Sequence, residues 1–308
     1  MRENIQGEQA REQIDFLWLE LTNQCNLQCS HCYADSGPLK GTEDRLGRSK
    51  YQELIVEAYE LGCRRLQFIG GEPTLNSDLP DFIELASKTG YSFLEVFTNL
   101  TRIPSGLLLC FKQHGVQVAT SVYASSALIH DKITHLEGSF EKTTNNLKML
   151  LREAVPVRVG VIELPENLGT TDVTVQFVRS LGVQNVGTDR LRFFGRGGEN
   201  RNSELSELCG GCAQKTLCVG SDGRVSPCIM SKAWTIGSVL NGSLAALARS
   251  EQLLSLRSAI YSHTGGSRNI GIHDICTPKT CSPYSSCNPS FGPGPCAPSG
   301  CNPCFPKG

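Results

Sequence analysis

The 308-residue sequence predicts an α/β fold, in which about six strand–helix units form a parallel sheet that is followed by a cysteine-rich extension. Two observations support this prediction. Apolar runs of strand length alternate with helix-like segments through the first two thirds of the chain. The composition then changes near 195–204, and the remainder carries ten of the 15 cysteines.

Each apolar run is short and rich in β-branched or aromatic residues, which is typical of a buried strand. In the first run, DFLWLEL, five of the seven residues are apolar. The six expected strands are 15–21, 65–69, 92–98, 116–122, 156–162 and 184–188.

Helix-like segments with spaced apolar residues lie between these strands, and several open with Ser, Thr, Asp or Pro. They are 49–62, 79–88, 104–114, 140–153 and 171–181. Strands that alternate with helices form a parallel sheet, either an open doubly wound sheet or a barrel. Six units would make a partial (β/α)6 TIM-like barrel, and ligand sites in both folds gather at the carboxyl ends of the strands.

Three parts of the chain follow from this pattern: a polar tail at 1–14, the partial barrel at 15–204 and the extension at 205–308. In the extension we expect a hairpin from Val219 to Ile229 that turns at Asp222–Gly223, and one helix from Ser243 to Tyr261. From Cys276 to Gly308 there are six Cys and eight Pro but no Leu, Ile, Val or Met, so we expect this segment to fold only around a metal cofactor.

Charge and hydropathy exclude several classes of partner. The 29 Lys and Arg nearly balance the 30 Asp and Glu, which gives no general reason to expect binding to nucleic acid or to an anionic membrane. The N-terminus has no apolar stretch of a secretory signal, and no run of about 18 apolar residues could span a bilayer. We expect a soluble, cytoplasmic protein whose thiols stay reduced, so metal ligation explains the cysteines better than disulfides do.

Cys25, Cys29 and Cys32 form a Cys-x3-Cys-x2-Cys loop directly after the first expected strand. Three thiolates can hold three irons of a [4Fe–4S] cluster and leave the fourth iron open to an exogenous ligand. The alternative is a structural zinc site, which would need a fourth ligand such as His31.

The sequence CNLQCSHCY at 25–33 resembles the signature of the radical S-adenosylmethionine (radical SAM) enzymes. The segment Gly70-Gly71-Glu72, directly after the second expected strand, resembles the GGE motif of that family. The resemblance implies a [4Fe–4S] cluster whose open iron binds S-adenosylmethionine (SAM). It also implies that the GGE backbone and carboxylate receive the SAM ammonium group.

Other positions resemble residues that lie near SAM or the cluster in this family, although ordinary strand-end turns and core packing would explain them as well. Thr98 and Asn99 follow the third strand, and Ser121 follows the fourth. All three resemble the polar residues that contact the ribose or carboxylate of SAM in this family. Arg158 and the segment 159–163 resemble positions that contact the carboxylate and adenine of SAM in this family. Tyr33 resembles an aromatic residue that lies beside the cluster. Cys63 and Cys110 have no Cys neighbours and are expected to be core thiols.

The remaining cysteines resemble the SPASM extension of many peptide-modifying radical SAM enzymes, which implies one or two auxiliary [4Fe–4S] clusters. The pattern departs from that extension because Cys276-x4-Cys281 is wider than usual and Phe291 stands where a further cysteine is expected. Zinc ribbons are the alternative for this tail. The candidate ligands are Cys209, Cys212, Cys218, Cys228, Cys276, Cys281, Cys287, Cys296, Cys301 and Cys304.

The resemblance implies an enzyme that, once reduced by a donor such as a flavodoxin or ferredoxin, cleaves SAM and abstracts hydrogen from a substrate C–H bond. A ribosomally synthesised peptide is the first expected substrate, to be cross-linked, oxidised or epimerised. Only about 14 residues precede the barrel, so we expect a separate protein to bind any leader peptide. A small molecule such as an amino-sugar is the alternative substrate, and a non-catalytic iron–sulfur or zinc scaffold is a third reading.

Overall fold

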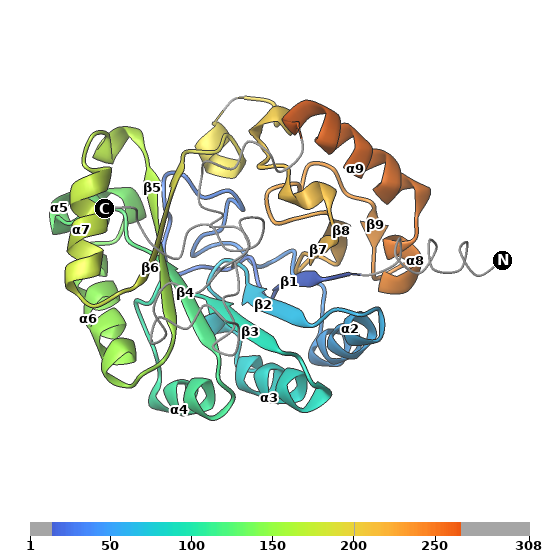
Figure 1. Ribbon diagram of the computed structural model, residues 1–308, viewed down its shortest axis with the longest axis horizontal. Coiled ribbons are helices and arrows are strands. Elements are labelled where there is room, and N and C mark those ends of the chain that lie inside the picture. The colour runs from blue at the N-terminus through green and yellow to red at the C-terminus, as the bar shows by residue number, and fades with distance from the viewer. Residues whose placement is uncertain (1–13, 200, 266–308) are drawn as a thin grey trace, which may run out of the picture.

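The computed structural model describes residues 14–199 and 201–265, and within them one curved sheet organises the molecule (Figure 1). All six strands predicted for the barrel are confirmed, and the strand order is β6-β5-β4-β3-β2-β1-β7-β8-β9. Strands β1 to β6 pair in parallel with their neighbours in the order of the chain. The barrel strands are β1 (Phe16–Glu20), β2 (Arg65–Ile69), β3 (Phe93–Phe97), β4 (Gln117–Ser121), β5 (Val157–Glu163) and β6 (Asn185–Arg190).

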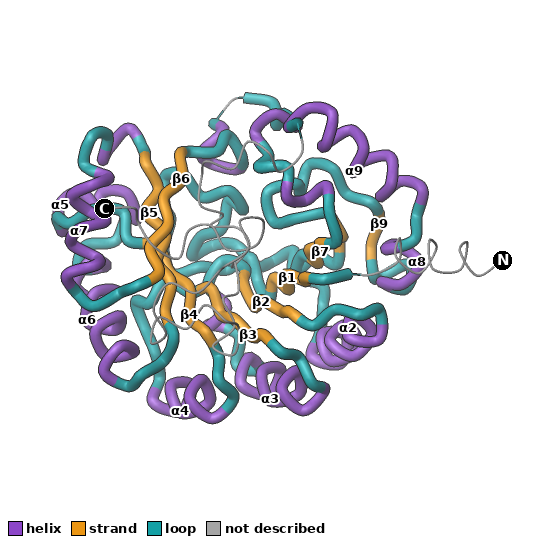
Figure 2. The backbone as a smooth tube through the Cα atoms, in the orientation of Figure 1, coloured by secondary structure: helices purple, strands orange, loops and turns teal. Residues whose placement is uncertain are grey.

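Five predicted helices are confirmed and lie on the outer, convex side of the sheet (Figure 2). They are α2 (Arg48–Glu60), α3 (Leu79–Thr89), α4 (Ser105–Gln113), α6 (Ser139–Arg152) and α7 (Thr171–Ser180). A sixth helix, α5 (Ala127–Thr134), was not predicted from the sequence. It has only eight residues, and two of its three buried side chains are the polar His130 and Thr134, so it carries almost no apolar periodicity.

The two faces of β1 explain how the sheet separates a core from an interior. Leu17 and Leu19 belong to the large apolar core that packs against the helices. Phe16 and Trp18 point to the opposite face and join a second apolar cluster with residues of the extension. Because successive side chains alternate between the faces of a strand, one five-residue strand takes part in both clusters.

The extension continues the barrel sheet. Its first strand, β7 (Thr216–Val219), pairs in parallel with β1, while β8 (Arg224–Ser226) and β9 (Gly237–Ser238) follow in antiparallel pairing. The predicted hairpin is therefore confirmed, and Gly223 has the positive φ of 83° that its turn requires. The β7–β1 pairing places Cys218 directly opposite Trp18.

The single helix expected over 243–261 is wrong, because the structure has two helices there. They are α8 (Leu244–Ala248) and α9 (Glu251–Thr264). Ser250 begins the second helix: its hydroxyl accepts a hydrogen bond from the backbone N–H of Leu253 at 3.2 Å. A serine in this position competes with the helical backbone and starts a new helix, so apolar spacing alone could not locate the break.

Several expectations lie outside the described residues, namely the polar tail up to residue 13 and the metal-dependent folding of 276–308. Among the residues that the structure describes, no helix has the length and apolar character needed to cross a membrane.

The pairing of β7 with β1 predicts that the extension and the barrel share stability. Replacing the fully buried Leu217 of β7 by Ala should lower the free energy of unfolding by about 2–5 kcal/mol, because it leaves a cavity in the common core. The matched control is Leu109→Ala on α4, where the side chain is 65% exposed and the change should be within about 0.5 kcal/mol. Urea unfolding followed by circular dichroism measures both, and equal stabilities of the two variants would contradict a shared core.

Candidate active site

The cysteine loop, residues 22–37, follows β1 at the carboxyl edge of the sheet. Cys25 is buried, and Cys29 and Cys32 are half-buried. Backbone N–H groups donate to two of the sulfurs, from Leu27 to Cys25 and from Ser36 to Cys32, each at 3.4 Å. Such donors stabilise a thiolate, which is the form of cysteine that binds iron.

The unpredicted helix α5 supports the same loop. The backbone N–H of Ser30 donates to the carbonyl of Ile133 at 2.9 Å, and that of Gln28 donates to the carbonyl of Thr134 at 3.1 Å. These are carbonyls of the last turn of α5, which has no helical donors left for them. The helix end and the loop therefore satisfy each other's backbone groups.

The GGE segment lies directly against the beginning of the cysteine loop. The N–H of Gly71 donates to the carbonyl of Thr22 at 2.7 Å, and the N–H of Glu72 donates to the carbonyl of Gln24 at 2.9 Å. A Cβ on Gly71 would lie 2.2 Å from the oxygen of Gln24, and one on Gly70 would lie 2.4 Å from the oxygen of Thr22. Both glycines are needed because two backbone segments touch here.

The carboxylate of Glu72 is buried and accepts four hydrogen bonds from the protein. Oε1 accepts from the hydroxyls of Thr98 and Thr74, each at 2.7 Å, and from the N–H of Thr74 at 3.1 Å. Oε2 accepts from the N–H of Asn99 at 2.8 Å. Burial raises the pKa of Glu72, and these donors oppose that shift. In this arrangement the carboxylate joins the ends of β2 and β3, while its expected contact with the SAM ammonium remains a proposal.

Asn99 connects the same strand end to the first cysteine. Its side-chain N–H₂ group lies 3.8 Å from the sulfur of Cys25 and donates to Asn26 at 2.8 Å. Thr98 and Asn99 thus lie within the site, although their described partners are Glu72, Cys25 and neighbouring polar groups rather than a ligand. The expected contacts of both residues with the ribose or carboxylate of SAM remain proposals.

A segment far along the chain, Phe194–Gly198, contacts the other end of the loop, and this contact was not predicted from the sequence. Arg196 donates from its backbone N–H to the carbonyl of Cys32 at 3.0 Å and from Nε to the carbonyl of Cys29 at 2.9 Å. Its guanidinium also pairs with Asp35 at 2.8 Å. A Cβ on Gly195 would lie 2.4 Å from the oxygen of Cys32. The signal that could have found this segment is its run of three glycines around one arginine after the sixth strand.

Burial and mutual proximity act on the thiols of the cysteine loop. Burial raises the pKa of Cys25 to about 12 and raises that of Cys29 as well, and the neighbouring cysteines add to both shifts. Among the described residues, no three His, Cys, Asp or Glu side chains lie close enough together to hold one metal ion. In a [4Fe–4S] cluster each cysteine binds a different iron, so three cysteines of one loop can hold that group without meeting at a single ion.

Aromatic side chains surround this loop. Tyr123, which was not predicted as a site residue, is within hydrogen-bonding reach of Cys29 and of Ser121. His31 packs edge-on against Tyr123 with ring centroids 4.7 Å apart, and burial lowers its pKa to about 4. Tyr33 packs against the second apolar cluster, so its expected position beside an iron–sulfur cluster stays a prediction.

Arg158 lies deeper in the barrel interior. Its Nε and a terminal nitrogen contact the two carboxylate oxygens of the fully buried Glu95 at 2.7 and 2.8 Å. Gln67 and Gln117 donate to the same carboxylate from the flanking strands. The guanidinium of Arg158 thus takes part in a polar network that links four strands, and its expected contact with the SAM carboxylate or adenine remains a proposal.

Four of the ten candidate auxiliary ligands lie within the described residues. Cys212 and Cys228 are buried and hydrogen-bonded to each other, and together with Cys209 and Trp18 they line a small, mostly apolar cavity. Cys218 is buried on the neighbouring strand β7. The indole N–H of Trp18 has no partner among the described residues, which fits a sulfur acceptor at this place. Cys63 and Cys110 are confirmed as thiols of the main core.

Family comparisons agree with this geometry. The sequence model of the radical SAM superfamily matches residues 19–178, which include the cysteine loop and the GGE segment. The chain belongs to the radical SAM superfamily. The model of an iron–sulfur cluster-binding domain, SPASM, matches residues 200–282 of the same radical SAM protein, so the predicted subfamily is confirmed.

Curated relatives match about three fifths of the chain. The chain is 29% identical over 181 residues to the antilisterial bacteriocin subtilosin biosynthesis protein AlbA of Bacillus subtilis, covering 58% of this chain and 40% of AlbA. It is 24% identical over 195 residues to the PqqA peptide cyclase of Rhodopseudomonas palustris, covering 62% and 50% of the two chains. An Fe-coproporphyrin III synthase of Methanosarcina barkeri matches at 25% identity over 186 residues, 60% of this chain and 46% of the synthase. The chain spans half or less of the length of these relatives.

Solved structures share the fold. Streptococcus suis SuiB bound to S-adenosylmethionine superposes with a TM-score of 0.68 at 12% identity over 83% of this chain and 71% of SuiB. Native anSMEcpe with bound AdoMet and Cp18Cys peptide superposes with a TM-score of 0.63 at 16% identity, over 80% of this chain and 83% of anSMEcpe. The partial barrel with its extension is thereby confirmed as a radical SAM fold.

The close approach of Gly71 to the cysteine loop predicts a specific loss of iron. Gly71→Ala should displace the loop, because the new Cβ collides with backbone, so reconstituted protein should hold about four fewer irons, the content of one [4Fe–4S] cluster. Gly106→Ala on α4 is the control, since a Cβ there meets no atom within 4 Å. Iron analysis after anaerobic reconstitution measures both variants, and a Gly71→Ala protein with its full iron content would contradict the assigned loop.

Proposed function

We propose that this protein is a radical SAM enzyme that reductively cleaves S-adenosylmethionine and removes hydrogen from a C–H bond of a ribosomally synthesised peptide. The observation that carries the proposal is the cysteine loop, which is hydrogen-bonded to the GGE segment at its beginning and to Arg196 at Cys29 and Cys32. The family match to residues 19–178 supports the same chemistry.

The groups that this chain would hold are a [4Fe–4S] cluster on Cys25, Cys29 and Cys32 and one or two auxiliary clusters on the later cysteines. When bound, the first cluster supplies an electron to SAM and so generates a 5′-deoxyadenosyl radical. The chain itself fixes the sulfurs through backbone contacts and excludes water around Cys25 by burial. Reducing electrons would come from a flavodoxin or ferredoxin.

Peptide substrates are favoured by the relatives and by the solved structures. A PqqA peptide cyclase, a bacteriocin biosynthesis protein and a SuiB structure bound to precursor peptide SuiA all resemble this chain. Cross-linking, oxidation and epimerisation are the peptide modifications we propose, in the cytoplasm and with a separate leader-binding protein.

A small-molecule substrate is the second candidate. The Fe-coproporphyrin III synthase resembles this chain, and so does the structure of BtrN in complex with AdoMet and 2-DOIA, with a TM-score of 0.52 at 15% identity over 85% of this chain and 91% of BtrN. For both candidates the radical chemistry is the same, and only the occupant of the barrel interior differs.

The test of the proposed chemistry is SAM cleavage. Anaerobically reconstituted, dithionite-reduced protein should convert SAM to methionine and 5′-deoxyadenosine, measured by liquid chromatography with mass detection. Replacing Cys25, Cys29 and Cys32 together by Ala should abolish this cleavage and remove about four of about twelve irons, because the auxiliary cysteines remain. The matched control replaces Cys63 and Cys110 by Ala. This variant should keep both its SAM cleavage and its iron content. Cleavage that persists in the triple variant would refute the assignment.

A further inference from the structure

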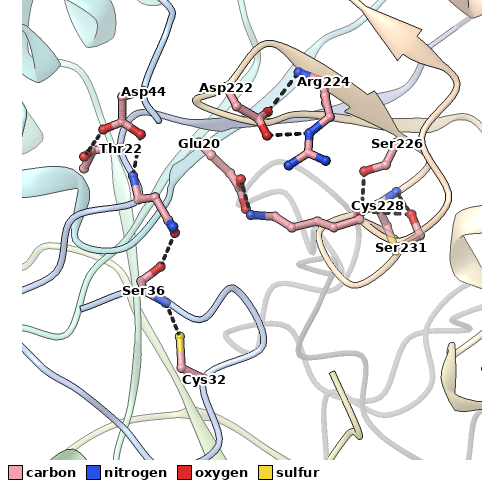
Figure 3. A network of polar contacts seen from close by, with 12 residues as sticks. Glu20, Thr22, Cys32, Ser36, Asp44, Asp222, Arg224, Ser226, Cys228 and Ser231 are labelled. Carbon is pink, nitrogen blue, oxygen red and sulfur yellow. Dashed lines mark hydrogen bonds and ion pairs between the residues drawn. The ribbon is translucent and has the colours of Figure 1, made fainter. Parts of the chain in front are cut away.

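A cavity of about 460 Å³ lies between the cysteine loop and the hairpin of the extension. One wall comes from Ala34 to Glu43 and the other from Cys218 to Ser226, with Glu20 and Lys232 also in the lining. Figure 3 shows Glu20 between the Cys32–Ser36 side of the site and the Asp222–Arg224 side. The volume is that of a small-ligand site rather than of a few waters.

Glu20 has one unsatisfied oxygen. Its side chain is 3% exposed, and Oε2 contacts Nζ of Lys232 at 2.6 Å. Oε1 is buried and has no hydrogen-bond partner among the residues that the structure describes. A buried carboxylate oxygen without a donor costs free energy, so a donor supplied from within the cavity would be favoured there.

The surroundings of Glu20 are short of positive charge. Burial raises its pKa, Lys232 opposes that shift, and the carboxylates of Asp222 and Asp44 raise it further. Asp222 is paired with Arg224 at 2.6 Å, and Asp44 accepts from Thr22 and from the N–H of Asn23. The cavity lining holds four carboxylates against three cations, and each cation is already paired: Lys40 with Asp35, Arg224 with Asp222 and Lys232 with Glu20.

A metal ion does not fit this charge deficit, because no three His, Cys, Asp or Glu side chains converge on one point in the described part of the chain. A cavity of this size fits an organic cation better. Lysine and arginine side chains carry several N–H donors and one positive charge, which is what Oε1 of Glu20 lacks.

We infer that this cavity is a specificity subsite in which Glu20 receives the cationic side chain of a lysine or arginine in the peptide substrate. The inference rests on the proposed function, and it names the class of residue that the enzyme selects. The subsite adjoins the cysteine loop, since Asp35 in its wall donates its backbone N–H to the carbonyl of Cys32 at 3.2 Å. A side chain held by Glu20 would thus place its peptide next to the expected cluster.

The test is a binding selection without turnover. Reconstituted protein with SAM and no reductant is mixed with a randomised decapeptide library, acetylated and amidated so that only side chains carry positive charge. Bound peptides are identified by mass spectrometry. Wild type should enrich Lys or Arg, and Glu20→Gln should reduce this enrichment by about tenfold or more, as loss of a charged hydrogen bond predicts.

Two further variants make the result specific. Lys232→Met should increase the enrichment, because it removes the competing cation from Glu20. Glu60→Gln, which removes the same charge from an exposed residue of α2 that does not line the cavity, should leave it unchanged. Iron content confirms that each variant is folded, and if Glu20→Gln fails to fold, Lys232→Met decides alone.

The outcomes separate the inference from the proposed function. Wild-type protein that cleaves SAM but enriches no cationic residue would overturn the subsite and leave the radical chemistry standing. Enrichment that survives Glu20→Gln, or that Lys232→Met does not increase, would also overturn it. Wild-type protein that cleaves no SAM when reductant is added would instead refute the proposed function.

Discussion

The site depends on contacts between backbone atoms that leave no room for side chains. Gly71 and Gly195 touch the cysteine loop from two segments that lie more than a hundred residues apart, and a Cβ on either glycine would come within 2.4 Å of a carbonyl oxygen. Backbone contact of this kind fixes the positions of the cysteines without relying on flexible side chains. Arg196 adds hydrogen bonds to the carbonyls of Cys29 and Cys32, so the loop is held at both ends.

Strand β1 joins the two groups of cysteines. It leads directly into the cysteine loop, and it lies between β2, which the GGE segment follows, and β7, which carries Cys218. Trp18 and Glu20 of this one strand face the auxiliary cysteines and the charged cavity, respectively. A change in β1 would therefore affect both expected cluster sites and the proposed subsite together.

The sequence predicted the elements whose signal is local. Six strands and five helices were predicted from apolar periodicity, and the cysteine loop and GGE segment from their spacing. It could not predict that β7 pairs with β1 or that Arg196 reaches Cys29, because these contacts join residues far apart in the chain and follow from tertiary packing. It also missed α5, whose buried face is mostly polar, and the break at Ser250, where a hydroxyl group competes with the helical backbone. The role of Glu72 required the structure, since its four partners come from three separate residues.

The central claim is that the loop of Cys25, Cys29 and Cys32 holds a cluster whose open iron binds SAM. Electron–nuclear double resonance on the reduced protein, with SAM carrying ¹⁵N in its amino group, tests it most directly. Auxiliary clusters with complete cysteine ligation would show no such coupling, so overlapping signals do not confuse the result. We expect a ¹⁵N hyperfine coupling that disappears in the Cys29→Ala variant. A reduced cluster signal with SAM present and no ¹⁵N coupling would contradict it.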